Sequence, residues 1–137
     1  MDIPRWLFKQ ADDHARSLCP KEACGILVGP HPWADPTRWV PIRNISPEPE
    51  HTFIFDPEQQ LATWAEMEDN HEYPVVFVHS HPNSPPNPSK QDIRSALGYP
   101  DSVHLILSYL DRKHHLAAWH SYITRHGMHL PCVIRVV

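Results

Sequence analysis

The chain has 137 residues, of which 41% are hydrophobic and 20% charged, and its formal net charge is −4 with histidine neutral. This composition excludes an intrinsically disordered chain, and the acidic balance is not that of a nucleic-acid-binding protein. The length predicts one domain spanning residues 1–137, with a core large enough to be stable without disulfides.

The first part of the sequence predicts a helix followed by two strands. Pro4 favours a helix start, and apolar residues at helical spacing follow it until Pro20 ends the helix. The apolar run Ala23–Gly29, bounded by turn residues, predicts a buried strand. Thr37–Asn44 predicts an edge strand, because Pro41 cannot donate a hydrogen bond to a neighbouring strand.

The middle of the sequence predicts a short strand and a second helix. The strand is expected at residues 52–55. Asp56 and Pro57 suit the N-cap and the first position of a helix, and Gln59 is expected to reach back to the cap. This segment is expected to end at Tyr73-Pro74, because the residue before a proline avoids the helical conformation.

The remainder predicts a central strand, a third helix and closing strands. Val75–Val78 is continuously apolar and therefore predicts a strand buried on both faces. Ser89 begins a loop-to-helix entry, and closing strands are expected at residues 103–110, 115–123 and 132–137. This mixed order predicts an α/β or α+β fold on a mostly antiparallel sheet.

The cysteines and the first residues bear on the cellular compartment. The start of the chain lacks the basic and apolar regions of a secretory signal, and no apolar run approaches the ~20 residues of a membrane helix. Cys19, Cys24 and Cys132 are an odd number of cysteines, which favours reduced structural thiols and a cytoplasmic location. A zinc knuckle is not expected, because the Cys19/Cys24 pair has no second pair.

The stretch "VFVHSHPNSPPNPSKQDIRSAL" contains candidate metal ligands. Residues two apart in a strand point to the same side, so His79 and His81 should project together from a strand end. Asp92 lies on the first turn of the next helix, after a proline-rich bend. Two histidines and one carboxylate make the ligand set of a catalytic zinc site, which leaves one position for a water whose pKa falls to about 7.

Each part of this stretch also has an ordinary structural interpretation. Ser89 and Asp92, three residues apart, are typical of a helix-capping pair. An H-x-H pair alone is a weak metal signal, so the metal hypothesis depends on the whole combination of strand, histidines, bend and helix. Four further histidines lie among polar or turn-like residues and are not expected to bind metal: His114, His115, His126 and His129.

These residues resemble the JAMM (MPN+) metalloprotease motif, H-[ST]-H-P-x6-S-x2-D. His79-Ser80-His81-Pro82 is followed by Ser89 and Asp92 without insertion or deletion. The segment Pro20–Gly29, "PKEACGILVG", is similar to the family's upstream glutamate segment. The resemblance extends over roughly the first 109 residues, and Asn44–Asp56 is similar to the family's middle region.

The resemblance implies a single JAMM/MPN domain of cytidine-deaminase-like fold, with a curved, mixed and mostly antiparallel sheet flanked by helices. It implies one Zn2+ ion with a bound catalytic water and three protein ligands: His79, His81 and Asp92. Glu22 would be the general base that activates this water. Ser89 and zinc would stabilise the oxyanion, whereas Ser80 would point away and pack or hydrogen-bond the backbone.

The activity implied by the resemblance is hydrolysis of a peptide or isopeptide bond at the extended C-terminal tail of a ubiquitin-like or sulfur-carrier protein, as in stand-alone prokaryotic members. The tail would add as a strand beside the catalytic groove. Neither nucleic acid nor a membrane is an expected partner, and the oligomeric state stays open.

Two alternatives remain. The first is a JAMM peptidase acting on cell-wall or phage-tail substrates, which the lack of an attached wall-binding domain disfavours. The second is a non-catalytic MPN-fold binding module, although such modules typically lose a metal ligand. Cytidine-deaminase chemistry is disfavoured more strongly, because its H-x-E and P-C-x-x-C motifs are absent.

Overall fold

The computed structural model describes residues 1–111 and 117–137. A six-stranded sheet of order β3-β2-β4-β5-β6-β7 lies at its centre, and β1 and β8 form a separate pair. In chain order the described elements are β1 (Asp2–Ile3), α1 (Arg5–Leu18), β2 (Cys24–Gly29), β3 (Arg38–Ile42), α2 (Pro57–Asp69), β4 (Tyr73–His81), α3 (Lys90–Ala96), β5 (Val103–Ser108), β6 (Ala118–Arg125), β7 (Met128–Pro131) and β8 (Arg135–Val136).

The six-stranded sheet is mixed but mostly antiparallel. β2 pairs antiparallel with both β3 and β4, and β6 pairs antiparallel with both β5 and β7. β4 and β5 pair in parallel. β4 is a central strand, and its residues from Val75 to His81 are buried. These features confirm the predicted α+β fold class and the predicted buried strand at Val75–Val78.

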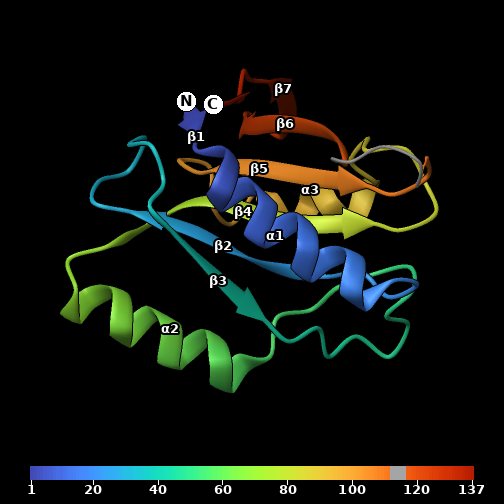
Figure 1. Ribbon diagram of the computed structural model, residues 1–137, viewed down its shortest axis with the longest axis horizontal. Coiled ribbons are helices and arrows are strands. Elements are labelled where there is room, and N and C mark those ends of the chain that lie inside the picture. The colour runs from blue at the N-terminus through green and yellow to red at the C-terminus, as the bar shows by residue number, and fades with distance from the viewer. Residues whose placement is uncertain (112–116) are drawn as a thin grey trace.

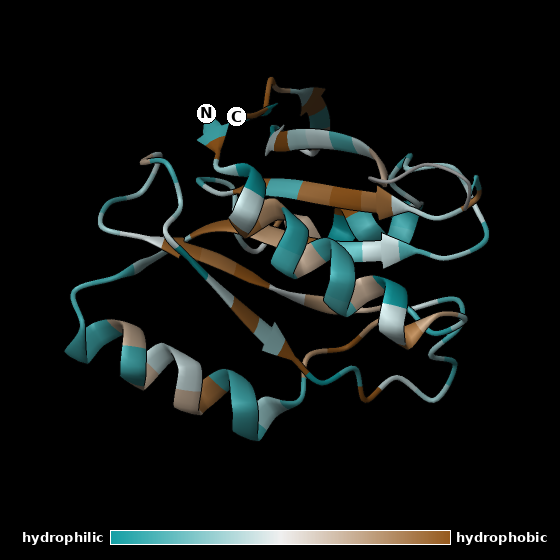
Figure 2. Cartoon of the chain, in the orientation of Figure 1, coloured by the Kyte–Doolittle hydropathy of each residue, from teal (hydrophilic) through white to brown (hydrophobic). Residues whose placement is uncertain are grey.

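The helices divide the structure into layers, with α1 in front of the sheet and α3 behind it in Figure 1. α1 packs against β3 and β4, α2 against the edge strand β3, and α3 against β6. The largest hydrophobic cluster joins α1 to the sheet and includes Leu7, Phe8, Leu27, Val76, Leu105 and Leu107. In Figure 2 the central strands are mostly hydrophobic, whereas the outer sides of α1 and α2 carry polar residues.

A buried polar network fixes α1 against the ends of the central strands. The Tyr109 hydroxyl donates to Asp12 Oδ1 at 2.7 Å, and Arg16 Nε lies 3.1 Å from the same oxygen. The Arg16 guanidinium also lies over the Tyr109 ring, 4.9 Å from its centroid. The Tyr109 amide donates to the His81 carbonyl at 3.1 Å. Tyr109 therefore contacts both the end of β4, at His81, and α1, the helix that precedes Glu22.

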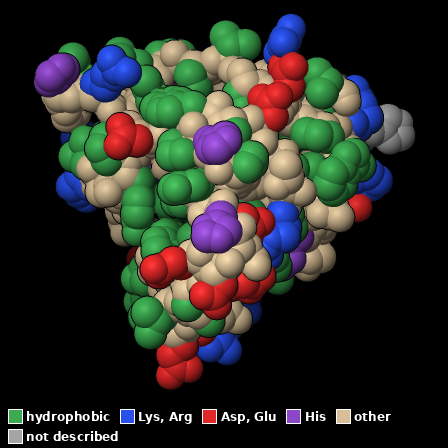
Figure 3. All heavy atoms as spheres, turned by 90° about the vertical axis from the view of Figure 1, so that its left-hand side faces the viewer, with side chains coloured by type: hydrophobic (Ala, Val, Ile, Leu, Met, Phe, Trp, Pro, Cys, Tyr) green, Lys and Arg blue, Asp and Glu red, His purple; other side chains and the backbone are tan. Residues whose placement is uncertain are grey.

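Acidic side chains gather in the lower part of the face shown in Figure 3, where the C-terminal end of α2 lies. Negative charge is unfavourable at this end of a helix, because the helix dipole is also negative there. Arg38 from β3 offsets it: its guanidinium lies 3.1 Å from Glu66 and 2.7 Å from Glu72. These contacts hold α2 against the sheet edge.

Two expectations for the middle of the chain were wrong. Residues 52–55 form no strand beyond a single bridge between Asn44 and Phe55, because the Asn44 side chain occupies the amide of Ile54. The Gln59 side chain does not return to the helix cap. It accepts the Arg43 amide at 2.6 Å, while Asp56 caps α2 by accepting the Glu58 amide at 3.0 Å.

The C-terminal region also differs from its prediction. The sequence analysis did not predict β7, an exposed strand of four residues that ends in a proline and is too short for a clear strand pattern. Of residues 132–137, Arg135–Val136 alone is a strand, and it pairs with β1 outside the six-stranded sheet. The strand expected from residue 115 is described from Ala118; residues 112–116, which contain His114 and His115, lie outside the described residues.

Two further features are the state of the cysteines and the lengths of the helices. Cys19, Cys24 and Cys132 are not joined by disulfides in the described structure, and Cys24 is buried. None of the helices in residues 1–111 and 117–137 is long and apolar enough to cross a bilayer.

Gly25 is required for the contact between β2 and β3. A Cβ atom there would lie 2.4 Å from the Trp39 side chain and 2.5 Å from the Val40 carbonyl oxygen, and the latter cannot move freely. We expect Gly25→Ala to lower the free energy of unfolding by about 1–3 kcal/mol, as overpacking does in other cores. In Gly98→Ala, the control, the nearest atom lies at an ordinary 3.6 Å, so urea denaturation should show a much smaller change.

Candidate metal centre

The pairing of β2 with β4 brings Glu22 to the histidine pair. The two strands are antiparallel, with Cys24 opposite His79. The Ser80 amide extends this register by donating to the Ala23 carbonyl at 3.0 Å. Because alternate residues of a strand share one face, Glu22 and His81 are the next side chains on the side that carries His79.

The first turn of α3 supplies the carboxylate of Asp92. Ser89 is the N-cap, and its hydroxyl oxygen accepts the Asp92 amide at 3.0 Å. Asp92 Oδ2 accepts the Ser89 amide at 2.9 Å, which completes a capping box. The predicted capping pair is therefore confirmed. The same Oδ2 atom also faces the histidines, so capping does not remove Asp92 from the cluster.

Four buried side chains converge on one point. Oxygen or nitrogen atoms of Glu22, His79 and His81 all lie within 4.8 Å of one another. Asp92 Oδ2 lies 3.3 Å from His79 Nε2 and 3.1 Å from His81 Nε2. The structure thus brings together four of the predicted site residues. Ser89, the fifth, lies at the edge of the cluster through its contacts with Asp92.

The hydrogen bonds of the cluster direct a lone pair of the neutral His81 ring toward the carboxylate of Asp92. His81 Nδ1 lies 2.8 Å from the Pro85 carbonyl, which only accepts, so Nδ1 carries a proton. In the neutral ring, Nε2 then presents its lone pair to Asp92. Within this cluster, Glu22 Oε1 and His79 Nε2 have no hydrogen-bond partner among the described residues, although His79 Nε2 lies 3.3 Å from the Asp92 carboxylate. Such an arrangement is stable only with a proton or a cation between these atoms.

Burial and mutual contacts shift the pKa values of the cluster. Burial raises the pKa of Glu22 to about 7. Burial also favours the neutral form of Asp92, but its contacts with His79 and His81 outweigh this and hold the pKa far below its usual range. Burial lowers the pKa of His79. For His81, burial is outweighed by the contacts with Asp92 and Pro85, and the pKa is raised.

These donors fit a divalent zinc ion. Imidazole nitrogen and carboxylate oxygen are the ligand types that zinc takes in catalytic sites, and such sites need neutral histidines and ionised acids. The unpartnered Glu22 Oε1 and His79 Nε2 atoms are the observation that supports this fit. Without a cation, the cluster leaves buried polar atoms unsatisfied.

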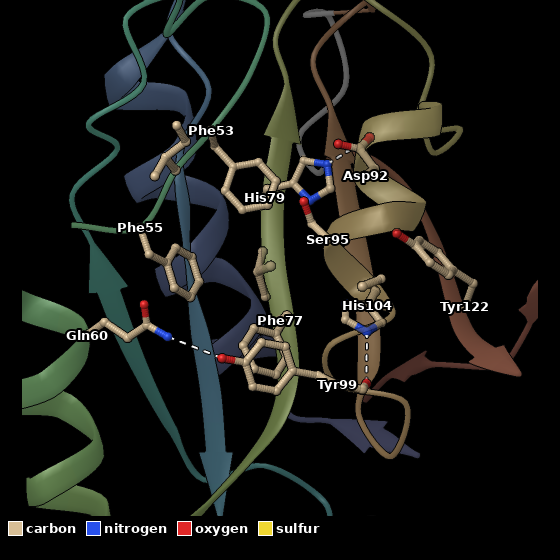
Figure 4. A pocket seen from close by; sticks show the side chains of 13 residues that line it. Phe53, Phe55, Gln60, Phe77, His79, Asp92, Ser95, Tyr99, His104 and Tyr122 are labelled. Carbon is tan, nitrogen blue, oxygen red and sulfur yellow. Dashed lines mark hydrogen bonds and ion pairs between the residues drawn. The ribbon is translucent and has the colours of Figure 1, made fainter. Parts of the chain in front are cut away.

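An aromatic cavity lies beside His79 and Asp92, and Figure 4 shows it from close by. It has a volume of about 280 Å3, and His79 and Asp92 line one end of it. The Phe53 ring stacks on the His79 ring with centroids 4.5 Å apart. The aromatic side chains lining the cavity are Phe53, Phe55, Phe77, Tyr99, His104 and Tyr122. This lining suits an apolar chain segment more than a charged one.

The cavity walls are fixed by hydrogen bonds and burial. The Gln60 side-chain amide lies 3.2 Å from the Tyr99 hydroxyl, which links α2 to the segment after α3. His104 Nε2 lies 3.3 Å from the Tyr99 carbonyl. Burial lowers the pKa of His104 to about 4, so this ring is neutral near pH 7.

Sequence reasoning did not assign a role to three residues that shape the site. Phe53 stacks on His79, the Pro85 carbonyl fixes the His81 ring, and Asn44 contacts the Glu22 carbonyl through its side chain at 3.0 Å. No spacing rule connects these residues to the histidines. Of the three, only Asn44 is suggestive in the sequence. It stands at the end of a predicted strand, and its side chain has two donors and two acceptor positions with which to organise a loop.

Comparisons with known proteins agree with this geometry. The profile of the family described as "Prokaryotic homologs of the JAB domain" matches residues 4–122. The CysO-cysteine peptidase of Mycobacterium tuberculosis is 38% identical over 102 residues, covering 74% of this chain and 68% of that protein. The desampylase of Haloferax volcanii is 36% identical over 102 residues, covering 74% and 73%. The solved structure of a protein from Desulfitobacterium hafniense has a TM-score of 0.78 and 27% identity, covering 100% of this chain and 94% of that one.

The Ser80 side chain connects β4 to the residue that precedes β2, in agreement with the predicted hydrogen bond between this side chain and the backbone. The Ala23 amide donates to Ser80 Oγ at 2.8 Å, and Ser80 is fully buried. We expect Ser80→Ala to lower the free energy of unfolding by about 1–3 kcal/mol, because the buried Ala23 amide loses its partner. Ser17→Ala, which removes an exposed hydroxyl, should change it by less than about 0.5 kcal/mol in the same denaturation experiment.

Proposed function

The chain belongs to the family of prokaryotic homologues of the JAB domain, and from this premise we propose that it is a zinc-dependent peptidase. Its proposed reaction is hydrolysis of a peptide or isopeptide bond at the C-terminal tail of a ubiquitin-like or sulfur-carrier protein. We also propose that residues 1–137 form one domain of this kind. The observation that carries the proposal is the buried cluster of Glu22, His79 and His81 beside Asp92, in which Glu22 Oε1 and His79 Nε2 lack a hydrogen-bond partner.

His79, His81 and Asp92 would hold the zinc ion in this proposal. The short distances from Asp92 Oδ2 to both Nε2 atoms support this set, 3.3 Å to His79 and 3.1 Å to His81. A set of three protein ligands would leave room for a water molecule or the substrate at the ion. When bound, zinc supplies Lewis-acid chemistry: it polarises the scissile carbonyl group and acidifies a water molecule.

Glu22 would act as the proton carrier of the reaction. A carboxylate that does not bind the metal can accept a proton from the attacking water and return it to the nitrogen of the leaving group. Burial supports this role, because it raises the pKa of Glu22 to about 7, where a carboxyl group both accepts and releases protons. The nearby contacts of its backbone with Asn44 and Pro49 hold it in place.

Ser89 would stabilise the oxyanion through its hydroxyl. Its oxygen accepts the Asp92 amide at 3.0 Å, so the helix cap uses a lone pair and leaves the hydroxyl proton for another acceptor. A donor of this kind, fixed before the reaction, stabilises the charge that develops on a carbonyl oxygen. Capping and catalysis are therefore compatible in this residue.

The substrate class is inferred from the relatives and from the cavity. Two relatives are named CysO-cysteine peptidase and desampylase, and a third, from Thermus thermophilus, is named a probable TtuB-protein conjugate cleaving protease. The aromatic cavity of about 280 Å3 beside His79 suits an extended apolar tail. Wall or phage-tail peptides are the alternative substrates. A non-catalytic binding module is disfavoured by the convergence of all the candidate ligands.

The substrate assignment can be tested directly. We expect the zinc-loaded protein to cleave a sulfur-carrier protein extended beyond its C-terminal Gly-Gly, with release of the extension measured by mass spectrometry. Peptidoglycan stem peptides should stay intact in parallel reactions. Cleavage of the stem peptides with no cleavage of the extended carrier would favour the cell-wall alternative. Absence of both activities in protein that has bound zinc would favour the binding module.

The ligand set can be tested by zinc content. We expect Glu22→Gln to retain one zinc ion per chain and to lose at least about 100-fold in kcat, because a proton carrier is lost and no ligand is. Glu48→Gln, in the adjacent exposed loop, is the matched control and should keep full activity. A loss of zinc from Glu22→Gln would instead make Glu22 a ligand.

Asp92 variants separate metal binding from helix capping. We expect both Asp92→Ala and Asp92→Asn to lose zinc and activity, because each removes the carboxylate. Asp92→Asn keeps an oxygen that can accept the Ser89 amide, so its free energy of unfolding should exceed that of Asp92→Ala by about 0.5–2 kcal/mol in metal-free protein. Normal zinc content in either variant, measured by elemental analysis, would restrict Asp92 to its capping role.

A further inference from the structure

The backbone of Glu22 is held by a loop and not by the sheet. Glu22 precedes β2, so its main chain lies outside the described strand pairing. Its amide donates to the Pro49 carbonyl at 2.7 Å, and its carbonyl accepts Asn44 Nδ2 at 3.0 Å. Both partners belong to the segment that connects β3 to α2. The orientation of the Glu22 carboxylate thus depends on the conformation of this connection.

The side-chain amide of Asn44 has all of its hydrogen-bonding capacity in use. Its Nδ2 atom donates to the carbonyls of Glu22 and Thr52, each at 3.0 Å. Its Oδ1 atom accepts the amides of Ser46 and Ile54, each at 3.0 Å. Two donors and two acceptor positions are the full inventory of an asparagine side chain. No other residue of this length offers the same set, because aspartate has no donor.

The loop that Asn44 closes is also bonded internally. The Thr52 amide and hydroxyl both donate to the Glu48 carbonyl, at 3.0 and 3.2 Å, and the Thr52 hydroxyl contacts that of Ser46. The Glu48 amide donates to the Ser46 hydroxyl at 3.1 Å. These internal hydrogen bonds connect the beginning of the loop to its end.

The same loop carries the aromatic ring that covers a candidate zinc ligand. Phe53 directly follows Thr52, whose carbonyl Asn44 binds, and its ring stacks on His79 at a centroid distance of 4.5 Å with 27° between the planes. Figure 4 shows this ring beside the imidazole, at one end of the cavity. One side-chain amide therefore contacts the backbone of Glu22 and also the segment that orients Phe53 over His79.

We propose that Asn44 is a positioning residue that sets the Glu22 carboxylate and the His79 ring relative to one another. The proposal rests on the proposed function for the roles of these two residues as base and zinc ligand. Catalysis by proton transfer depends on placement, and a displacement of about 1 Å can reduce a rate about 100-fold. Asn44 touches neither substrate nor metal in this proposal; it acts through the loop.

The first test uses the metal-free full chain and needs no activity. In Asn44→Asp the two acceptor contacts remain, but a carboxylate oxygen faces the carbonyls of Glu22 and Thr52. We expect NMR-detected hydrogen exchange at the Glu22 amide to accelerate at least about tenfold, while the amides of β4 change less than about twofold. We also expect the ring-proton shifts of His79, assigned with a His79→Gln variant, to lose the contribution of the stacked Phe53 ring.

Two further variants complete this test. Asn70→Asp changes an exposed asparagine at the end of α2 and should leave both signals unchanged. If Asn44→Asp does not fold, Asn44→Ala, which adds no charge, takes its place with the same expectations. Unchanged Glu22 exchange and unchanged His79 shifts would overturn the proposal. Equal acceleration of every amide would also overturn it, because it would show a general loss of stability.

The second test measures catalysis by zinc-loaded protein on the extended sulfur-carrier substrate. We expect Asn44→Asp to bind zinc normally, with kcat lowered about tenfold or more and KM changed less than about threefold, since positioning acts on the transition state. A change in KM alone would overturn the positioning role. An inactive wild-type protein would contradict the proposed function but leave the exchange and shift measurements decisive for Asn44.

Discussion

The candidate site depends on the register between β2 and β4. Cys24 lies opposite His79 in this register. Glu22, which precedes β2, and His81, which ends β4, therefore lie on the same face of the sheet and close to each other. A slip of one residue would turn the histidines to the α1 side of the sheet, because alternate side chains point to opposite faces. The Ser80 contacts with Ala23 fix the register at the point where the two strands diverge.

The two acids of the cluster are both buried, but their pKa values shift in opposite directions because they have different partners. Glu22 is desolvated without a hydrogen-bond partner for Oε1, so its pKa rises to about 7. Asp92 is also buried, but two imidazoles and the Ser89 amide keep it ionised. Two buried carboxylates of one cluster thus differ in protonation behaviour, which supports the division between the proposed base and the proposed ligand.

The sequence allowed the central strand, the capping box and the convergence of His79, His81 and Asp92 to be predicted, because each depends on short-range spacing. Their connection to Glu22 rested on resemblance to a family, since no local rule pairs strands that are about 50 residues apart. β7 was not predicted because a four-residue strand that ends in a proline is too short for its pattern to be distinguished from a turn. The strand predicted at residues 52–55 does not form, because the Ile54 amide donates to the Asn44 side chain and not to a neighbouring strand.

The parallel pairing of β1 with β8 has a consequence for the connectivity of the fold. Asp2 and Arg135 are paired in the register and joined by a two-point ion pair, and the labelled ends lie side by side in Figure 1, away from the point where β4 reaches the histidines. Because the two ends are adjacent, a short linker can join them while the chain is opened at another place, and the same elements keep their positions in the fold. A circular permutant opened at the exposed bend around Trp33 would keep the β2–β4 pair that carries the candidate site.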